Sequence, residues 1–97
     1  MRASPLLAAL LVAATTAGHA QQLAAPAGAA SCSGCHASAA RPSAIPSLEG
    51  RAPAEIFTAM RDFRAGRRHA TLMDRIAKGF TDDELAALAA YVAEPRR

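Results

Sequence analysis

The 97-residue chain has few of the large side chains from which a small protein usually builds its core. It contains no tryptophan, one tyrosine and three phenylalanines, and much of its 52% hydrophobic composition is alanine. A domain of this size buries only about 60% of the surface that its unfolded chain exposes. Such chains usually recruit a disulfide, a metal or a cofactor. The shortage of large apolar residues therefore predicts that something besides side-chain packing completes the core.

The sequence also lacks an apolar run of the ~20 residues that a membrane span needs. The longest run, residues 6–17, follows a positive charge at Arg2 and precedes Gly-His-Ala at 18–20, where small residues occupy the first and third positions of a secretory cleavage site. We interpret residues 1–20 as a signal peptide, cleaved near its end, and residues 21–97 as one exported, periplasmic domain without a membrane span. An uncleaved membrane anchor is the alternative.

Strand periodicity and internal repeats are absent, and the remaining patterns predict an all-α domain. An alanine-rich segment with Pro26 at its possible start predicts a short helix that runs into the two cysteines. Residues 38–53 contain three prolines and a glycine, which indicates a loop. A second helix is expected from Pro53 to Gly66, with a stripe of apolar residues at Ile56, Met60 and Phe63.

The clearest helix signal begins at residues 81–84, which read Thr-Asp-Asp-Glu. This is a capping box with extra acidic residues in the first turn, where they favour the helix dipole. Pro95 ends the helix, and its apolar stripe consists of Leu85, Leu88 and Val92, joined by Ala89 and Tyr91. The connection before it contains Met73 and one possible turn of helix at residues 74–77. The prediction is three main helices plus loops.

Only two cysteines are present, and with the next residue they form the most specific motif of the chain. Residues 32–36 read Cys-Ser-Gly-Cys-His, the spacing of covalent haem attachment. On a helix, Cys32 and Cys35 lie on one face about one turn apart, within reach of two neighbouring vinyl groups of one porphyrin. His36 follows and can offer Nε2 to the iron. The motif predicts one covalent haem c.

Three other uses of these residues were weighed. A thioredoxin-like redox pair needs a βαβ context, which the sequence lacks. A zinc site needs four ligands, and beyond the motif the chain offers only His69 and carboxylates without paired spacing. A plain disulfide would close a small loop and constrain the unfolded chain little. Haem is favoured because the export signal and the small core agree with it.

Met60, Met73 and His69 are the candidates for the second axial position of the iron. Met60 lies on an apolar stripe, which suits core packing, whereas Met73 lies between helices and can be presented to a ligand. Met73 is therefore favoured, and the resulting His/Met ligation is typical of electron-transferring cytochromes. The other nitrogen of His36 needs an acceptor, which the loop at 45–46 is placed to supply.

The formal charge of residues 21–97 is small, at ten basic against eight acidic residues once Arg2 is removed. This balance is not that of a nucleic-acid-binding protein. Basic residues concentrate in the middle of the chain at Arg51, Arg61, Arg64, Arg67, Arg68, Arg75 and Lys78. They form either a solvated helix face with a contact to the haem propionates or a surface that steers an acidic redox partner.

With the motif at 32–36, a Pro-x-Leu-x-Gly segment at 46–50 and the stretch 70–82, the chain resembles the class I cytochromes c. More narrowly, residues 24–94 resemble the single-haem cytochrome subunit of flavocytochrome c sulfide dehydrogenase. The resemblance implies thioether attachment at Cys32 and Cys35, His36 and Met73 as iron ligands, and Pro46 as the carbonyl partner of His36. It also implies that the amino-terminal helix packs on the carboxy-terminal helix near Tyr91.

The same resemblance implies a periplasmic electron-transfer protein that is not an enzyme by itself. In such complexes a flavoprotein subunit oxidises sulfide and passes electrons one at a time to the cytochrome. The residues of this chain show no flavin site of their own. The alternatives are a free carrier for another periplasmic oxidoreductase or terminal oxidase, and a haem sensor or peroxidase with an open iron position.

Overall fold

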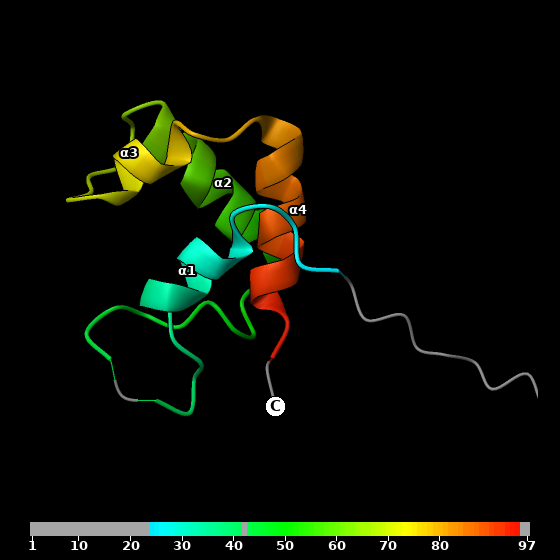
Figure 1. Cartoon of the computed structure of the whole chain (residues 1–97). Helices are drawn as coiled ribbons and strands as arrows, with labels where there is room; N and C mark the ends of the chain where they lie inside the picture. The colour runs from blue at the N-terminus through cyan, green and yellow to red at the C-terminus, as the bar shows by residue number, and fades with distance from the viewer. Residues whose placement is uncertain (1–23, 42, 96–97) are drawn as a thin grey trace, which may run out of the picture.

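The computed structural model describes residues 24–41 and 43–95, so the signal peptide expected at 1–20 lies outside the described residues. The described ranges contain four helices and no strand. The helices, labelled in Figure 1, are α1 (Ala29–Cys35), α2 (Pro53–Arg64), α3 (Met73–Ala77) and α4 (Asp82–Ala93). This result confirms the all-α prediction. Within the same ranges, no helix has the length and apolar composition that a membrane crossing requires.

Helix α1 begins three residues later than the sequence suggested. Pro26 does not open the helix, because its carbonyl accepts a hydrogen bond from Ala29 N (3.1 Å) in the turn that precedes α1. The residue before the helix is Gly28, whose φ of +89° lies in the left-handed region. The ring of Phe80 lies where a Cβ at position 28 would point. Glycine is therefore required there both by the backbone and by a long-range contact.

Helices α2 and α4 begin and end where the sequence signals predicted. Pro53 is at the first turn of α2, and Gly66 follows the end of that helix with a φ of +74°. At the start of α4, Thr81 Oγ1 accepts a hydrogen bond from Glu84 N (3.3 Å) while Glu84 Oε2 accepts one from Thr81 N (2.9 Å). This reciprocal pair is the predicted capping box.

The buried core is small and lies where α2 packs on α4 and α1 crosses α4. In Figure 1, α1 (cyan) and α3 (yellow) lie apart from each other on one side of α4. Tyr91 and Cys32 both pack against the central cluster, as the resemblance implied for the two terminal helices. The buried apolar residues are Ala29, Ile56, Ala77, Leu85, Leu88, Ala89, Val92 and Ala93. Half of them are alanines, so the core is thin, as the composition predicted.

Ion pairs neutralise some of the basic residues in the middle of the chain. Arg64 donates to the carbonyl of Phe80 (Nη1 to O, 3.0 Å) and forms an ion pair with Asp82. Arg61 Nε lies 3.7 Å from the same carboxylate. The hydrogen bond from Arg64 is the main reason why the pKa of Asp82 lies below its ordinary value of 3.8; desolvation opposes this shift, and the charges of Arg64 and Arg61 add to it. These contacts join the end of α2 to the start of α4.

We expect the Asp82 ion pairs to make stability depend on pH in acid. Because the pKa of Asp82 is lowered in the folded protein, the pairs stabilise it fully above the ordinary carboxyl pKa and this contribution is lost as pH falls through the folded value. Urea denaturation of the wild type and of Asp82→Asn should show a stability difference at neutral pH that shrinks below about pH 3.8. If the stability difference between the two proteins were the same at neutral pH and below pH 3.8, the stabilising role of the Asp82 ion pairs would be contradicted.

The contact between Gly28 and Phe80 predicts a position-specific cost of adding a methyl group. A Cβ at residue 28 would lie 2.7 Å from Phe80 Cζ, whereas one at Gly50, with a similar φ of +78°, would meet nothing within 4 Å. We expect Gly50→Ala to cost about 1–2 kcal/mol from backbone strain alone and Gly28→Ala to cost roughly 1–3 kcal/mol more from the clash. Equal losses in urea denaturation would show that the ring contact is unimportant.

Candidate cofactor site

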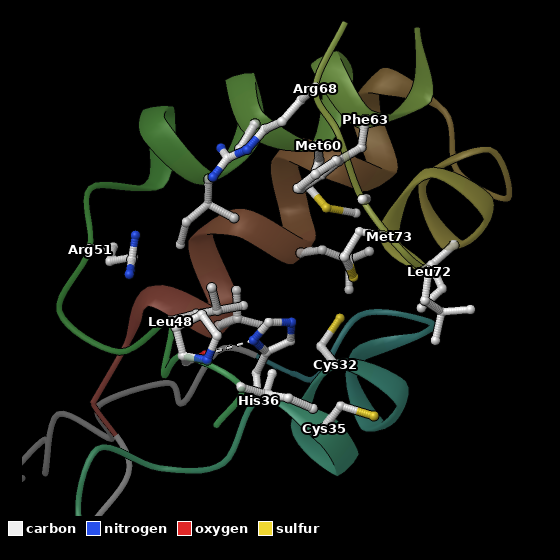
Figure 2. Close-up of a pocket in the computed structure, with 18 of the residues that line it drawn as sticks. Cys32, Cys35, His36, Leu48, Arg51, Met60, Phe63, Arg68, Leu72 and Met73 are labelled. Atoms are coloured by element: carbon white, nitrogen blue, oxygen red, sulfur yellow. Dashed lines mark hydrogen bonds between the residues drawn. The ribbon is translucent and has the colours of Figure 1, made fainter. Parts of the chain in front are cut away.

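A cavity of about 510 Å³ lies between α1, α2, α3 and the connecting loops. Its walls are mainly apolar, with Ile56, Leu88 and Val92 of the core at its base. This volume is in the range of roughly 300–1,000 Å³ that is usual for small-molecule and cofactor pockets. Figure 2 shows side chains from separate helices and loops meeting there. The cavity occupies the region that a larger hydrophobic core would fill.

Helix α1 supplies one wall of the cavity. Cys32 and Cys35 both line it, and they are not joined by a disulfide. Three residues of separation put the two sulfurs on one face of the helix, with Cys32 half-buried and Cys35 exposed. The helix ends at Cys35, and the following residue, His36, leaves helical geometry at a φ of −88° and a ψ of 82°. Its ring therefore turns into the cavity beside the two thiols (Figure 2).

A hydrogen bond fixes the imidazole of His36. Its Nδ1 lies 2.7 Å from the carbonyl oxygen of Pro46, the contact expected from the sequence. A carbonyl can only accept, so Nδ1 carries the proton, and in the neutral ring the lone pair lies on Nε2. Ring orientation by a second partner is the usual arrangement for a metal-binding histidine. The structure thus shows an oriented imidazole with one nitrogen left for a ligand.

The loop that carries Pro46 is held from both sides. Gly50 N donates to the carbonyl of Ala93 at the end of α4 (2.9 Å), and Leu48 packs against the core cluster. At the other side of the loop, Ala39 N donates to Glu49 Oε2 (3.1 Å). A Pro-rich stretch without helix or strand thereby acquires a defined path. These contacts explain how a loop can position a carbonyl against His36.

Two methionines reach the cavity from the side opposite α1. Met73 is the first residue of α3, and Met60 lies on α2; both line the cavity and both are half-buried. Figure 2 shows both side chains extending toward the space above the His36 ring. The prediction of core packing for Met60 is incomplete, because Met60 packs against the core cluster and also lines the cavity. His69 lines the same cavity from an exposed position.

Two of the basic residues, Arg51 and Arg68, also line the cavity, whereas the sequence pattern predicts a contact with haem propionates without indicating which residues make it. Arg51 donates from Nε to the carbonyl of Ser47 (3.3 Å), and the guanidinium of Arg68 lies over the ring of Phe63, 4.9 Å from its centroid. Among the described residues, neither forms an ion pair with a carboxylate of the chain. Glu55 is a carboxylate on the same wall.

The geometry gives no support to the alternative zinc site. In the part of the chain that the structure describes, no three His, Cys, Asp or Glu side chains come close enough together to hold a metal ion. The cysteines and His36 are instead arranged along one side of an apolar cavity. Residues arranged in this way can contact a single large group in the cavity.

Comparison with known proteins agrees with the resemblance read from the motifs. No family model matches the chain. Over 62 residues, the chain is 45% identical to the cytochrome subunit of sulfide dehydrogenase of Chlorobaculum tepidum. The alignment covers 63% of this chain and 56% of that relative, so the chain spans little more than half of the relative's length. The chain resembles the cytochrome subunit of a sulfide dehydrogenase.

Proposed function

We propose that this protein is a small periplasmic c-type cytochrome that carries single electrons. The observation that carries the proposal is the His36 imidazole, oriented by Pro46 at 2.7 Å, beside two thiols in an apolar cavity. The identity to a cytochrome subunit supports the same conclusion. Residues 1–20, which lie outside the described residues, are proposed to export the chain to the compartment where haem is attached.

The residues present fit one haem c. Cys32 and Cys35 stand about one turn apart on the face of α1 that lines the cavity and would form the two thioether bonds. His36 would bind the iron through Nε2, because Nδ1 already donates to Pro46. An apolar cavity of about 510 Å³ would exclude water from the ring. When bound, the haem supplies a one-electron couple whose potential depends on the axial ligands and on burial.

Met73 is proposed as the second axial ligand. Its side chain lines the cavity from the wall opposite His36, so this chain would supply two iron ligands, His36 and Met73 (Figure 2). Thioether sulfur is soft and neutral, so it favours the ferrous state and raises the reduction potential relative to a second histidine. No position would then remain for a substrate. This closed arrangement favours electron transfer over a sensor or a peroxidase.

Arg51 and Arg68 are proposed to hold the two haem carboxylates. They add two positive charges to an otherwise mainly apolar cavity, offset in part by Glu55. A guanidinium donates two parallel hydrogen bonds to a carboxylate, which makes arginine suited to this contact. This role accounts for two of the basic residues in the middle of the chain. Arg61, Arg64 and Arg67 are used differently, since each lies beside an aspartate of the chain.

The proposed electron donor is a flavoprotein that oxidises sulfide, on the strength of the relative's description as a subunit of sulfide dehydrogenase. Because the chain spans 56% of that relative, a free carrier for another periplasmic oxidoreductase is the alternative partner assignment. Reduction by a purified sulfide-oxidising flavoprotein, compared with reduction by unrelated periplasmic dehydrogenases, separates the two.

Covalent attachment should depend on both cysteines. After expression with export and the haem attachment machinery, the wild-type chain should stain for haem on a denaturing gel. The Cys32→Ser/Cys35→Ser double variant should lose the stain, because no thioether bond can form. Each single variant should keep at most one bond. Absence of stain in the wild type, beside a control cytochrome that stains, would favour a haem-free cysteine pair.

Substitution of the two methionines should separate the iron ligand from its neighbour. Leucine has a similar volume, so either change should cost less than about 1.5 kcal/mol through packing. Met73→Leu should abolish the red-edge charge-transfer absorption band of methionine-ligated ferric haem and open the iron to added imidazole. Met60→Leu should keep the band. A band that survives in Met73→Leu and disappears in Met60→Leu would reverse the assignment.

A further inference from the structure

The segment 65–81, which carries Met73, packs on α2 through α3 but buries few of its own side chains. Several of its residues line the cavity, yet Arg67 to His69 and Thr71 to Leu72 are exposed. Its one helix, α3, has five residues, and Ala77 is its single buried residue. A helix this short is not stable by itself in water. The position of Met73 must therefore be set by contacts that the segment makes with the rest of the chain.

Arg64 makes such contacts across the two ends of the segment. It is the last residue of α2, and its guanidinium donates to the carbonyl of Phe80 (3.0 Å) and pairs with Asp82 at the start of α4. Its side chain is 29% exposed, against 64% for that of Arg67. Hydrogen bonds that involve a charged group are stronger when they are partly shielded from water. Arg64 thus closes the segment into a loop.

The same contacts tie the segment to the wall that carries His36. The ring of Phe80, whose carbonyl Arg64 holds, lies against Gly28 at the start of α1. Helix α1 then leads directly into His36. Arg64, Phe80 and Asp82 do not line the cavity. Any effect they have on the site must act through the relative position of its two walls.

We propose that Arg64 is a positioning residue that keeps Met73 opposite His36 by closing segment 65–81 against the start of α4 and, through Phe80, against α1. This inference rests on the proposed function, because it takes Met73 as an iron ligand. Arg64 would not touch the cofactor. Its loss would let the segment open locally, so that Met73 leaves the iron more often while the haem stays attached through the cysteines.

The test uses the exported holoprotein and imidazole as a probe of the ferric iron. In Arg64→Gln, imidazole should bind roughly three- to tenfold more tightly than in the wild type, because a lost charge-assisted hydrogen bond makes local opening more frequent. Arg64→Lys, which keeps the charge but not the guanidinium fork, should fall between them. Arg67→Gln is the matched control, since Arg67 pairs with Asp62 and does not span the segment.

Urea denaturation of each variant separates positioning from general stability. If Arg64→Gln lowers the denaturation midpoint while its imidazole affinity equals that of the wild type, the inference is overturned. The same conclusion follows if Arg67→Gln changes the affinity as much as Arg64→Gln does. If Arg64→Gln fails to fold, Arg64→Lys and Asp82→Asn can replace it, because each weakens the contacts only in part. Their imidazole affinities are then compared with that of Arg67→Gln.

The wild-type spectrum distinguishes this inference from the function on which it rests. A wild-type protein without the charge-transfer band of methionine ligation would overturn both the ligand assignment and the role of Arg64. A wild-type protein with the band, together with an unchanged band and affinity in Arg64→Gln, would overturn only the role of Arg64.

Discussion

The constraint on which the rest of the structure depends is the shortage of large apolar side chains. Half of the buried apolar residues are alanines, and Leu85 is the one large side chain that is less than 2% exposed in the described residues. Helices α2 and α4 pack closely at one side, and a cavity of about 510 Å³ remains at the other. Because a small domain has little stability to spare, a large apolar group in that cavity would complete the core. Binding of the proposed haem would therefore stabilise the fold.

The site depends on elements that are individually weak. The loop at 43–50 holds Pro46 against His36 because Gly50 is bonded to the end of α4. The five-residue helix α3 carries Met73, and the proposed role of Arg64 and Phe80 is to fix the segment around it. Both walls of the cavity are thus joined to α4, one through the Gly50–Ala93 hydrogen bond and the other through the Arg64–Asp82 ion pair. A precise binding site requires side chains that are held in place by contacts with rigid elements.

Local signals in the sequence predicted much of this architecture. The capping box at Thr81, proline at the first turn of α2 and the glycine that follows α2 act over a few residues, so their outcome can be read from the chain. The spacing of Cys32 and Cys35 is local in the same sense. Pro26 was misread as a helix start, because the start of α1 depends on Gly28 and on Phe80, far along the chain. The dual position of Met60 and the contacts of Arg51, Arg64 and Arg68 also depend on tertiary packing, which periodicity does not reveal.

Proton NMR of the reduced protein tests the two proposed iron ligands most directly, because the side chain of a methionine bound to haem iron lies in the shielding region of the porphyrin ring and its methyl resonance moves far upfield. We expect one such methyl resonance, assigned to Met73, and a His36 Nδ1 proton protected by the carbonyl of Pro46. A shifted methyl assigned to Met60, or no shifted methionine resonance at all, would contradict it.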